Sequence, residues 1–119
     1  MDRRLLGSFG EERAARYLRR KGYTILGMNY RCRLGEIDII AKRRGFVVFA
    51  EVKLRRDADF AAAREFVTAS KQERIRATAA LWLSRNETAL QPRFDVLEVY
   101  APQGPEGPVE IHHIENAFE

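Results

Sequence analysis

Glu51 and Lys53 end an apolar run, where charged side chains are unusual. Residues 46–53 read Phe-Val-Val-Phe-Ala-Glu-Val-Lys, and alternation along a β-strand places Glu51 and Lys53 on one face. Both faces of this run begin with apolar side chains, which is typical of a central strand covered on both sides. Charges in such a strand are costly unless they are paired or bound to a metal. The pair is therefore a candidate for chemistry, with a solvated ion pair as the alternative.

A second acidic residue, Asp38, lies between two isoleucines in residues 36–41. Lys42 to Gly45 form a short connection, so residues 36–41 and 46–53 are predicted to form a β-hairpin. If the loop has two or four residues, Asp38 shares a face with Glu51. The two are then direct or diagonal neighbours, and a diagonal pair is separated by about 7–8 Å between Cα atoms. A three-residue loop would place them on opposite faces.

Two carboxylates and one ammonium group on one face suit metal-assisted hydrolysis of a phosphodiester bond. Mg²⁺ binds one or two carboxylates together with waters and phosphate oxygens. The ion acidifies a bound water and offsets charge on the phosphate, and Lys53 can orient that water or neutralise the phosphate. We therefore predict Asp38 and Glu51 as ligands of Mg²⁺ or Mn²⁺, with Lys53 as a catalytic residue beside them.

Glu11 and Glu12 are neighbours in the first predicted helix, residues 8–21, but the pattern gives them different surroundings. Glu11 shares a face with small and apolar residues three, four and seven positions later. Glu12 can pair with Arg16 on the solvated side. Glu11 is therefore predicted to complete the metal shell or to anchor Lys53. The predicted catalytic set is Glu11, Asp38, Glu51 and Lys53.

Basic residues close to this set indicate a polyanionic partner. The net charge is +4, which is compatible with nucleic acid. Arg55 and Arg56 follow the site in the sequence, and Lys71 and Gln72 open a second predicted helix, whose N-terminus attracts phosphate. We predict that these four residues contact nucleic acid, with DNA as the expected partner. Simple exposure to solvent explains the same residues equally well.

The remaining pattern predicts an α/β protein with helices packed on a mixed sheet. Ser70 and Glu73 fit a capping box at the start of the second helix, residues 70–85. This helix is long enough for a right-handed crossover between parallel strands. The predicted strands are residues 23–28, 36–41, 46–53 and 93–100, with 109–114 as a fifth.

Length and composition define the class of protein. A chain of 119 residues is predicted to form one domain, 1–119. Its 45% hydrophobic and 32% charged residues fit a soluble globular protein. Cys32 is the only cysteine, which excludes an intramolecular disulfide and a zinc site built on several thiolates. We recognise no signal sequence or membrane span, so we expect a cytoplasmic protein with no membrane partner.

Short motifs along most of the chain resemble those of the YraN-like family of bacterial proteins. The resemblance implies the PD-(D/E)XK nuclease superfamily, near the archaeal Holliday junction resolvases, and a restriction-endonuclease-like αβββαβ core. The motifs are Gly-Ser-Phe-Gly-Glu at 7–11 followed by Ala14, Tyr17 and Leu18, Gly-Glu-Ile-Asp-Ile-Ile-Ala at 35–41, Phe-Ala-Glu-Val-Lys at 49–53, Lys71-Gln72, Arg-Phe-Asp at 93–95 and Asn-Ala-Phe at 116–118.

By this resemblance, Glu11 matches the first-helix acid, Asp38 the motif aspartate, and Glu51 and Lys53 the Glu-x-Lys pair. The resemblance implies an endonuclease acting on branched or otherwise structured DNA, and a two-fold symmetric junction would suit a homodimer. Residues 57–66 depart from the glycine-containing loop that the family usually carries, which bears on substrate engagement rather than on metal binding. Two alternatives stay open: a catalytically silent nuclease-fold protein that binds nucleic acid or a protein partner, and a protein whose carboxylates are structural.

Overall fold

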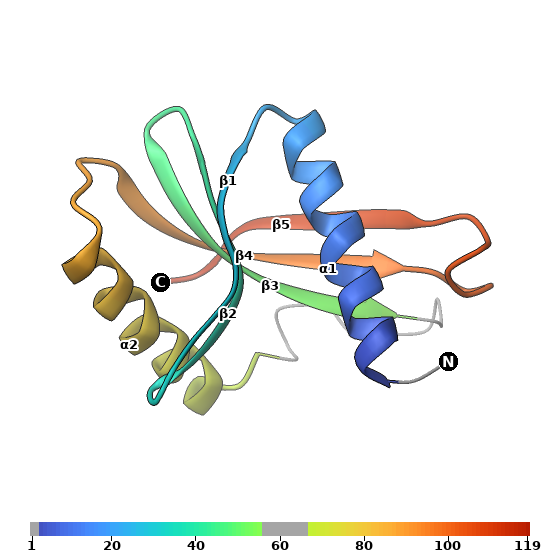
Figure 1. The fold of residues 1–119 in the computed structure, drawn as a ribbon, viewed down its shortest axis with the longest axis horizontal. Helices are drawn as coiled ribbons and strands as arrows, with labels where there is room; N and C mark the ends of the chain where they lie inside the picture. Colours follow the sequence, from blue (N-terminus) through green and yellow to red (C-terminus); the bar gives the residue numbers. More distant parts are fainter. Residues whose placement is uncertain (1–2, 56–66) are drawn as a thin grey trace.

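The computed structural model describes residues 3–55 and 67–119 as an αβββαββ chain (Figure 1). The predicted αβββαβ order is confirmed, and the fifth strand is present. Arg56 and residues 57–66, which the sequence singled out, lie outside the described residues. The elements are α1 Arg3–Arg20, β1 Thr24–Cys32, β2 Gly35–Arg43, β3 Phe46–Arg55, α2 Ala69–Arg85, β4 Gln91–Tyr100 and β5 Glu110–Phe118.

The strands form one mixed sheet in the order β1-β2-β3-β4-β5. β3 and β4 are parallel, whereas the other neighbouring strands are antiparallel. α2 supplies the crossover that parallel pairing requires. The predicted fold class, α/β with a restriction-endonuclease-like core, is therefore confirmed, and β3 lies in the middle of the sheet.

The two helices cover opposite faces of the sheet (Figure 1). Leu18 of α1 belongs to a buried cluster that includes Val48 of β3. Ile75 of α2 belongs to a second cluster that includes Phe49, the next residue along β3. β3 is thus buried on both faces, as predicted for a central strand. Neither described helix is long and apolar enough to cross a membrane.

A tight turn between β2 and β3 sets the register of the predicted site. Arg43 pairs with Phe46, so the turn consists of Arg44 and Gly45. Arg44 has a φ of 53°, in the left-handed region that tight hairpin turns use. A two-residue turn satisfies the condition under which Asp38 and Glu51 share a face.

The first helix and the first strand are longer than predicted. α1 begins at Arg3 rather than Ser8, and β1 continues to Cys32 rather than ending at Met28. Gly22, with a φ of 94°, follows the helix as predicted. The extension of β1 matters for function because it carries side chains to the edge of the site.

The predicted capping box of α2 is wrong. The helix begins at Ala69 and its N-cap is Thr68, whose hydroxyl accepts a hydrogen bond from the backbone N–H of Lys71 at 3.2 Å. Ser70 lies inside the first turn because Thr68, two residues earlier, already satisfies a free N–H group of the helix end. The cap places Lys71 in the first turn of α2.

Candidate active site

β2 and β3 diverge at the point where the predicted carboxylates lie. Their backbone pairing runs from the turn to Ile39 opposite Ala50. Beyond that pair, Asp38 Oδ2 accepts a hydrogen bond from the backbone N–H of Val52 at 2.8 Å. A side-chain carboxylate thus replaces the backbone acceptor that strand pairing would supply. This hydrogen bond holds Asp38 between the two strands, next to the space that their divergence opens.

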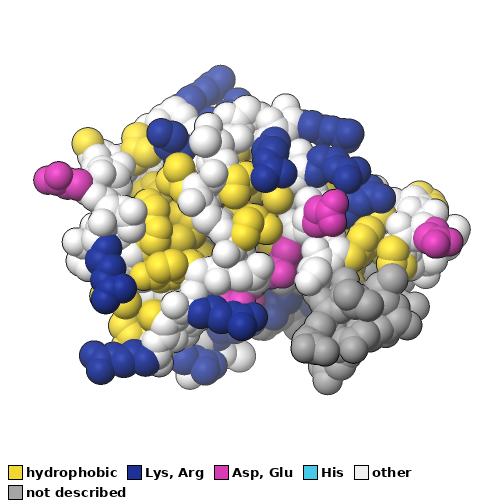
Figure 2. All heavy atoms as spheres, in the orientation of Figure 1, with side chains coloured by type: hydrophobic (Ala, Val, Ile, Leu, Met, Phe, Trp, Pro, Cys, Tyr) yellow, Lys and Arg dark blue, Asp and Glu magenta, His cyan; other side chains and the backbone are white. Residues whose placement is uncertain are grey.

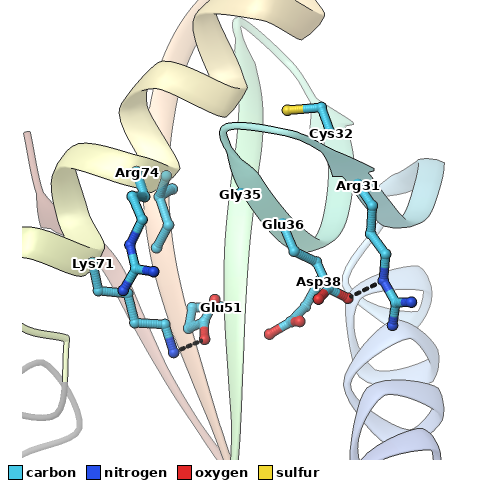
Figure 3. Close-up of a pocket in the computed structure, with 9 residues that line it drawn as sticks. Arg31, Cys32, Gly35, Glu36, Asp38, Glu51, Lys71 and Arg74 are labelled. Atoms are coloured by element: carbon cyan, nitrogen blue, oxygen red, sulfur yellow. Dashed lines mark ion pairs between the residues drawn. The ribbon is translucent and has the colours of Figure 1, made fainter.

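Glu51 points into the same space from β3. Its side chain is only 9% exposed, and its Oε1 lies 2.6 Å from Lys71 Nζ and 3.8 Å from Lys53 Nζ. Figure 3 shows the carboxyl groups of Asp38 and Glu51 directed toward each other in one cavity. The predicted meeting of Asp38, Glu51 and Lys53 is therefore present, and Lys71 from α2 joins it.

Glu11 approaches Asp38 from the α1 side of the sheet. The two carboxyl groups influence each other's ionisation, and both line a cavity of about 320 Å³. The Asn29 side-chain amide, in the orientation that matches donor to acceptor, donates to Glu11 Oε2 at 2.8 Å. Glu12 instead lies 3.6 Å from Arg16 on the exposed face. The different surroundings predicted for the two glutamates are confirmed.

Crowding changes the proton affinities of these groups. Burial raises the pKa of Asp38 to about 8, and the negative charges of Glu51 and Glu11 add to the rise. Burial also raises the pKa of Glu11. Burial lowers the pKa of Lys53, and the neighbouring ammonium of Lys71 lowers it further. Carboxylates that are difficult to ionise together form a site that gains from a bound cation.

The donor set fits a hard divalent cation. Asp38 and Glu51 offer carboxylate oxygens, the ligands that Mg²⁺ prefers in proteins. The described residues contain no group of three or more His, Cys, Asp or Glu side chains arranged to hold an ion by themselves. Mg²⁺ commonly takes one or two carboxylates and completes its shell with water and phosphate oxygens. A pair of carboxylates beside a cavity meets that requirement.

Basic side chains surround the carboxylates at the molecular surface. A cavity of about 420 Å³ is lined by Asp38 and Glu51 and by Arg31 of β1, Lys71 and Arg74 of α2 (Figure 3). On the face shown in Figure 2, Lys and Arg side chains lie above and below the acidic side chains near the centre, and a hydrophobic area lies to their left. The sequence reading missed Arg31 because its predicted strand ended too early. It missed Arg74 although the spacing of three from Lys71 on a helix indicates a shared face.

Two other predicted nucleic-acid contacts, Arg55 and Gln72, do not line this cavity. Arg55 Nε is 3.4 Å from Oε2 of the buried Glu98. Gln72 Nε2 donates to a backbone carbonyl oxygen at 2.9 Å. Of the predicted residues that the structure describes, Lys71 lines the cavity. Arg56 lies outside the described residues. Contacts of Arg55 and Gln72 with nucleic acid stay predictions.

Comparisons with known proteins identify similar chains of nearly the same length. The family described as "Uncharacterised protein family UPF0102" matches residues 10–99. A "UPF0102 protein" of Caldicellulosiruptor saccharolyticus is 43% identical over 119 residues, which covers 99% of this chain and 100% of the relative. A relative from Caldanaerobacter subterraneus is 41% identical, and the match covers 99% of this chain and 98% of the relative. One from Pelobacter propionicus is 46% identical, with 99% and 85% covered.

Proposed function

The chain belongs to the UPF0102 family, as its YraN-like motifs predicted, and we propose that it is a Mg²⁺- or Mn²⁺-dependent endonuclease of the PD-(D/E)XK type. Branched or otherwise structured DNA is the proposed substrate. One observation carries the proposal: Asp38 and Glu51, from two diverging strands, converge beside two ammonium groups in a cavity with arginines on its wall.

The residues around the cavity suit the parts of a phosphodiester hydrolysis. Asp38 and Glu51 would hold the ion, which when bound supplies an acidified water and offsets charge on the phosphate. Lys53, 3.8 Å from Glu51, lies where its ammonium can orient that water or neutralise the phosphate. Arg31 and Arg74 can bind phosphate oxygens. The water oxygen then bonds to phosphorus while the bond from phosphorus to one sugar oxygen breaks.

A purely structural role accounts less well for Asp38. In that case its carboxylate would be a satisfied anion, paired with Lys53, and its pKa would be low. Instead the carboxylate accepts a hydrogen bond from a backbone N–H and lies near three other carboxyl groups. Its pKa is raised to about 8, by burial first and then by Glu51. Unfavourable electrostatics of this kind are expected of a functional site rather than of a structural contact.

Cleavage of labelled DNA in Mn²⁺ tests the proposal. A four-way junction and a linear duplex that contains one of its strands serve as substrates, with EDTA as the metal-free control. We expect wild type to cut the junction, and Asp38→Asn or Glu51→Gln to lower the rate by roughly 100-fold or more, because the two residues act as a unit.

Neighbouring glutamates provide the matched control. Glu12→Gln alters an exposed residue of the same helix turn and should leave cleavage unchanged, whereas Glu11→Gln should reduce it. Nicking that survives in Glu51→Gln would assign the activity to another site or to a contaminant. Junction binding by wild type without any cleavage would favour the catalytically silent alternative. In that case the close pairing of Lys71 with Glu51 would serve to neutralise the Glu51 carboxylate.

A further inference from the structure

Lys71 holds the Glu51 carboxylate more closely than the strand lysine does. Both ammonium groups address Oε1, but Lys71 Nζ lies at 2.6 Å and Lys53 Nζ at 3.8 Å. The shorter distance is that of a charge-assisted hydrogen bond, and the longer one exceeds hydrogen-bonding range. A cation from α2 therefore already occupies the best acceptor position on Glu51.

A divalent ion at Asp38 and Glu51 would compete with this ammonium. The two cations repel each other at such short range, so one group must move when the ion binds. The side chain of Glu51 is 9% exposed and lies on the central strand. The side chain of Lys71 is 33% exposed and extends from the first turn of α2. The four-carbon stem of a lysine changes rotamer easily. Lys71 is therefore the group that moves.

Displaced Lys71 has a place to go. It lines both cavities that meet at the carboxylates, and the larger one, of about 420 Å³, also contains Arg31 and Arg74. The same cavity contains the carboxylate of Glu36, whose Oε1 lies 3.1 Å from Arg31 Nε and which can receive the released ammonium. The ammonium then adds to the positive charge of the two arginines, where a phosphate of the substrate would bind.

We propose that Lys71 is a displaceable counter-ion of Glu51: it neutralises the carboxylate in the metal-free protein and moves into the Arg31–Arg74 cavity when a divalent cation binds. The inference rests on the proposed metal site. The movement of Lys71 would make the binding of metal and of phosphate cooperative, because the ammonium that leaves Glu51 is the group that then binds the phosphate.

Calorimetric titration with Mn²⁺, without DNA, is the first test. Lys71→Met should bind Mn²⁺ about fivefold to tenfold more tightly than wild type, because the competing ammonium is absent. Arg74→Gln removes one positive charge from the same cavity without freeing Glu51, and we expect its affinity to stay within about twofold of wild type because salt screens the charge. Equal effects of the two substitutions, or weaker Mn²⁺ binding by Lys71→Met, would overturn the displacement.

Acetylation of the wild-type protein, read by peptide mass spectrometry, tests the movement without any substitution. Saturating Mn²⁺ should raise the rate at Lys71 severalfold and leave the exposed Lys42 of β2 unchanged. If Mn²⁺ binds wild type and the acetylation rate of Lys71 stays the same, the displacement of Lys71 is rejected while the proposed function stands. Failure of wild type to bind Mn²⁺ at all rejects both.

Discussion

At the scale of single residues, the unusual group is Asp38. It is held by a backbone hydrogen bond rather than by a cation, with the carboxyl groups of Glu51, Glu11 and Glu36 nearby. Its raised pKa means that the folded, metal-free protein keeps a proton that the unfolded chain releases. Between the ordinary carboxyl pKa and about 8, each rise in pH therefore favours unfolding.

We predict that the free energy of unfolding in EDTA falls as pH rises from 5 to 8, by at most about 1.4 kcal/mol per pH unit from this group. Asp38→Asn removes the ionisable group, so its slope should be shallower and its stability at pH 8 equal to wild type or higher. Urea unfolding at several pH values measures both quantities. A variant that is less stable at pH 8 and keeps the wild-type slope would show that Asp38 is a structural anion.

At the scale of elements, the site depends on how closely α2 approaches β2. A Cβ on Gly35, at the start of β2, would lie 2.9 Å from Thr78 Oγ1 of α2. Thr78 is fully buried, and its hydroxyl donates to the backbone carbonyl of Arg74 at 2.7 Å. The missing side chain thus allows the approach that carries Lys71 and Arg74 to the carboxylates.

Gly35→Ala should lower the free energy of unfolding by about 1–3 kcal/mol, through overpacking against α2 and through backbone strain at a φ of 155°. Gly27→Ala is the matched control in β1, because nothing lies within 4 Å of its added Cβ, and we expect a change of less than about 1 kcal/mol. Chemical denaturation of both variants decides between them. Equal stability of the two would mean that α2 can shift without cost and that the close approach is not required.

At the scale of the whole molecule, a net charge of +4 coexists with an acidic centre. Lys and Arg side chains lie above and below the central acidic group on the face shown in Figure 2. In the proposed nuclease, this arrangement would attract the phosphate backbone to the surface around the carboxylates.

DNA affinity should therefore fall steeply with salt, and Arg31→Gln and Arg74→Gln should each reduce the slope of log K against log salt by about 1. Arg16, which pairs with Glu12 on the outer face of α1, provides the control. Arg16→Gln should leave the slope unchanged. Fluorescence anisotropy at several salt concentrations measures it, and an equal loss in all three variants would point to a diffuse field instead of a defined groove.

A second buried carboxylate, Asp95, has the opposite electrostatic character and belongs to the scaffold. It is fully buried, accepts two hydrogen bonds from Arg93, contacts His113 Nε2 at 2.7 Å and accepts from the backbone N–H of Asn116. Burial alone would raise its pKa, but the hydrogen bonds from His113 and Arg93 outweigh it, and the pKa is lowered. The motifs at 93–95 and 116–118 thus meet in one network that ties β5 to β4.

Asp95→Asn should destabilise the protein by about 3–5 kcal/mol, because Arg93, whose side chain is 12% exposed, loses its closest anion. In wild type the contribution of Asp95 is present above the unfolded-state pKa and is lost as pH falls through the lower folded-state pKa. Asp38→Asn is the built-in comparison, since it is expected to have the opposite sign. Thermal melts of both at pH 8 measure this, and destabilisation by both would contradict the separation of site from scaffold.

Much of the site could be predicted because local periodicity decides it. Alternation along β3 put Glu51 and Lys53 on one face, and the parity of the β2–β3 turn put Asp38 with them. The helical repeat separated Glu11 from Glu12 in the same way. These relations hold within one element or across one tight turn, where chain geometry leaves few choices. The order of helices and strands was predicted from the same local patterns.

Tertiary structure alone decided which distant groups complete the site. The packing of α2 and β1 around the diverging strands makes Lys71 the closest partner of Glu51 and places Arg31 and Arg74 on the cavity wall. The hydrogen bond from the Val52 N–H to Asp38 depends on the same packing. The helix cap at Thr68 likewise depended on a choice between two hydroxyl residues that the local pattern could not make. Periodicity assigns a side chain to a face, but the distance between faces of different elements is set by core packing, which no single segment encodes.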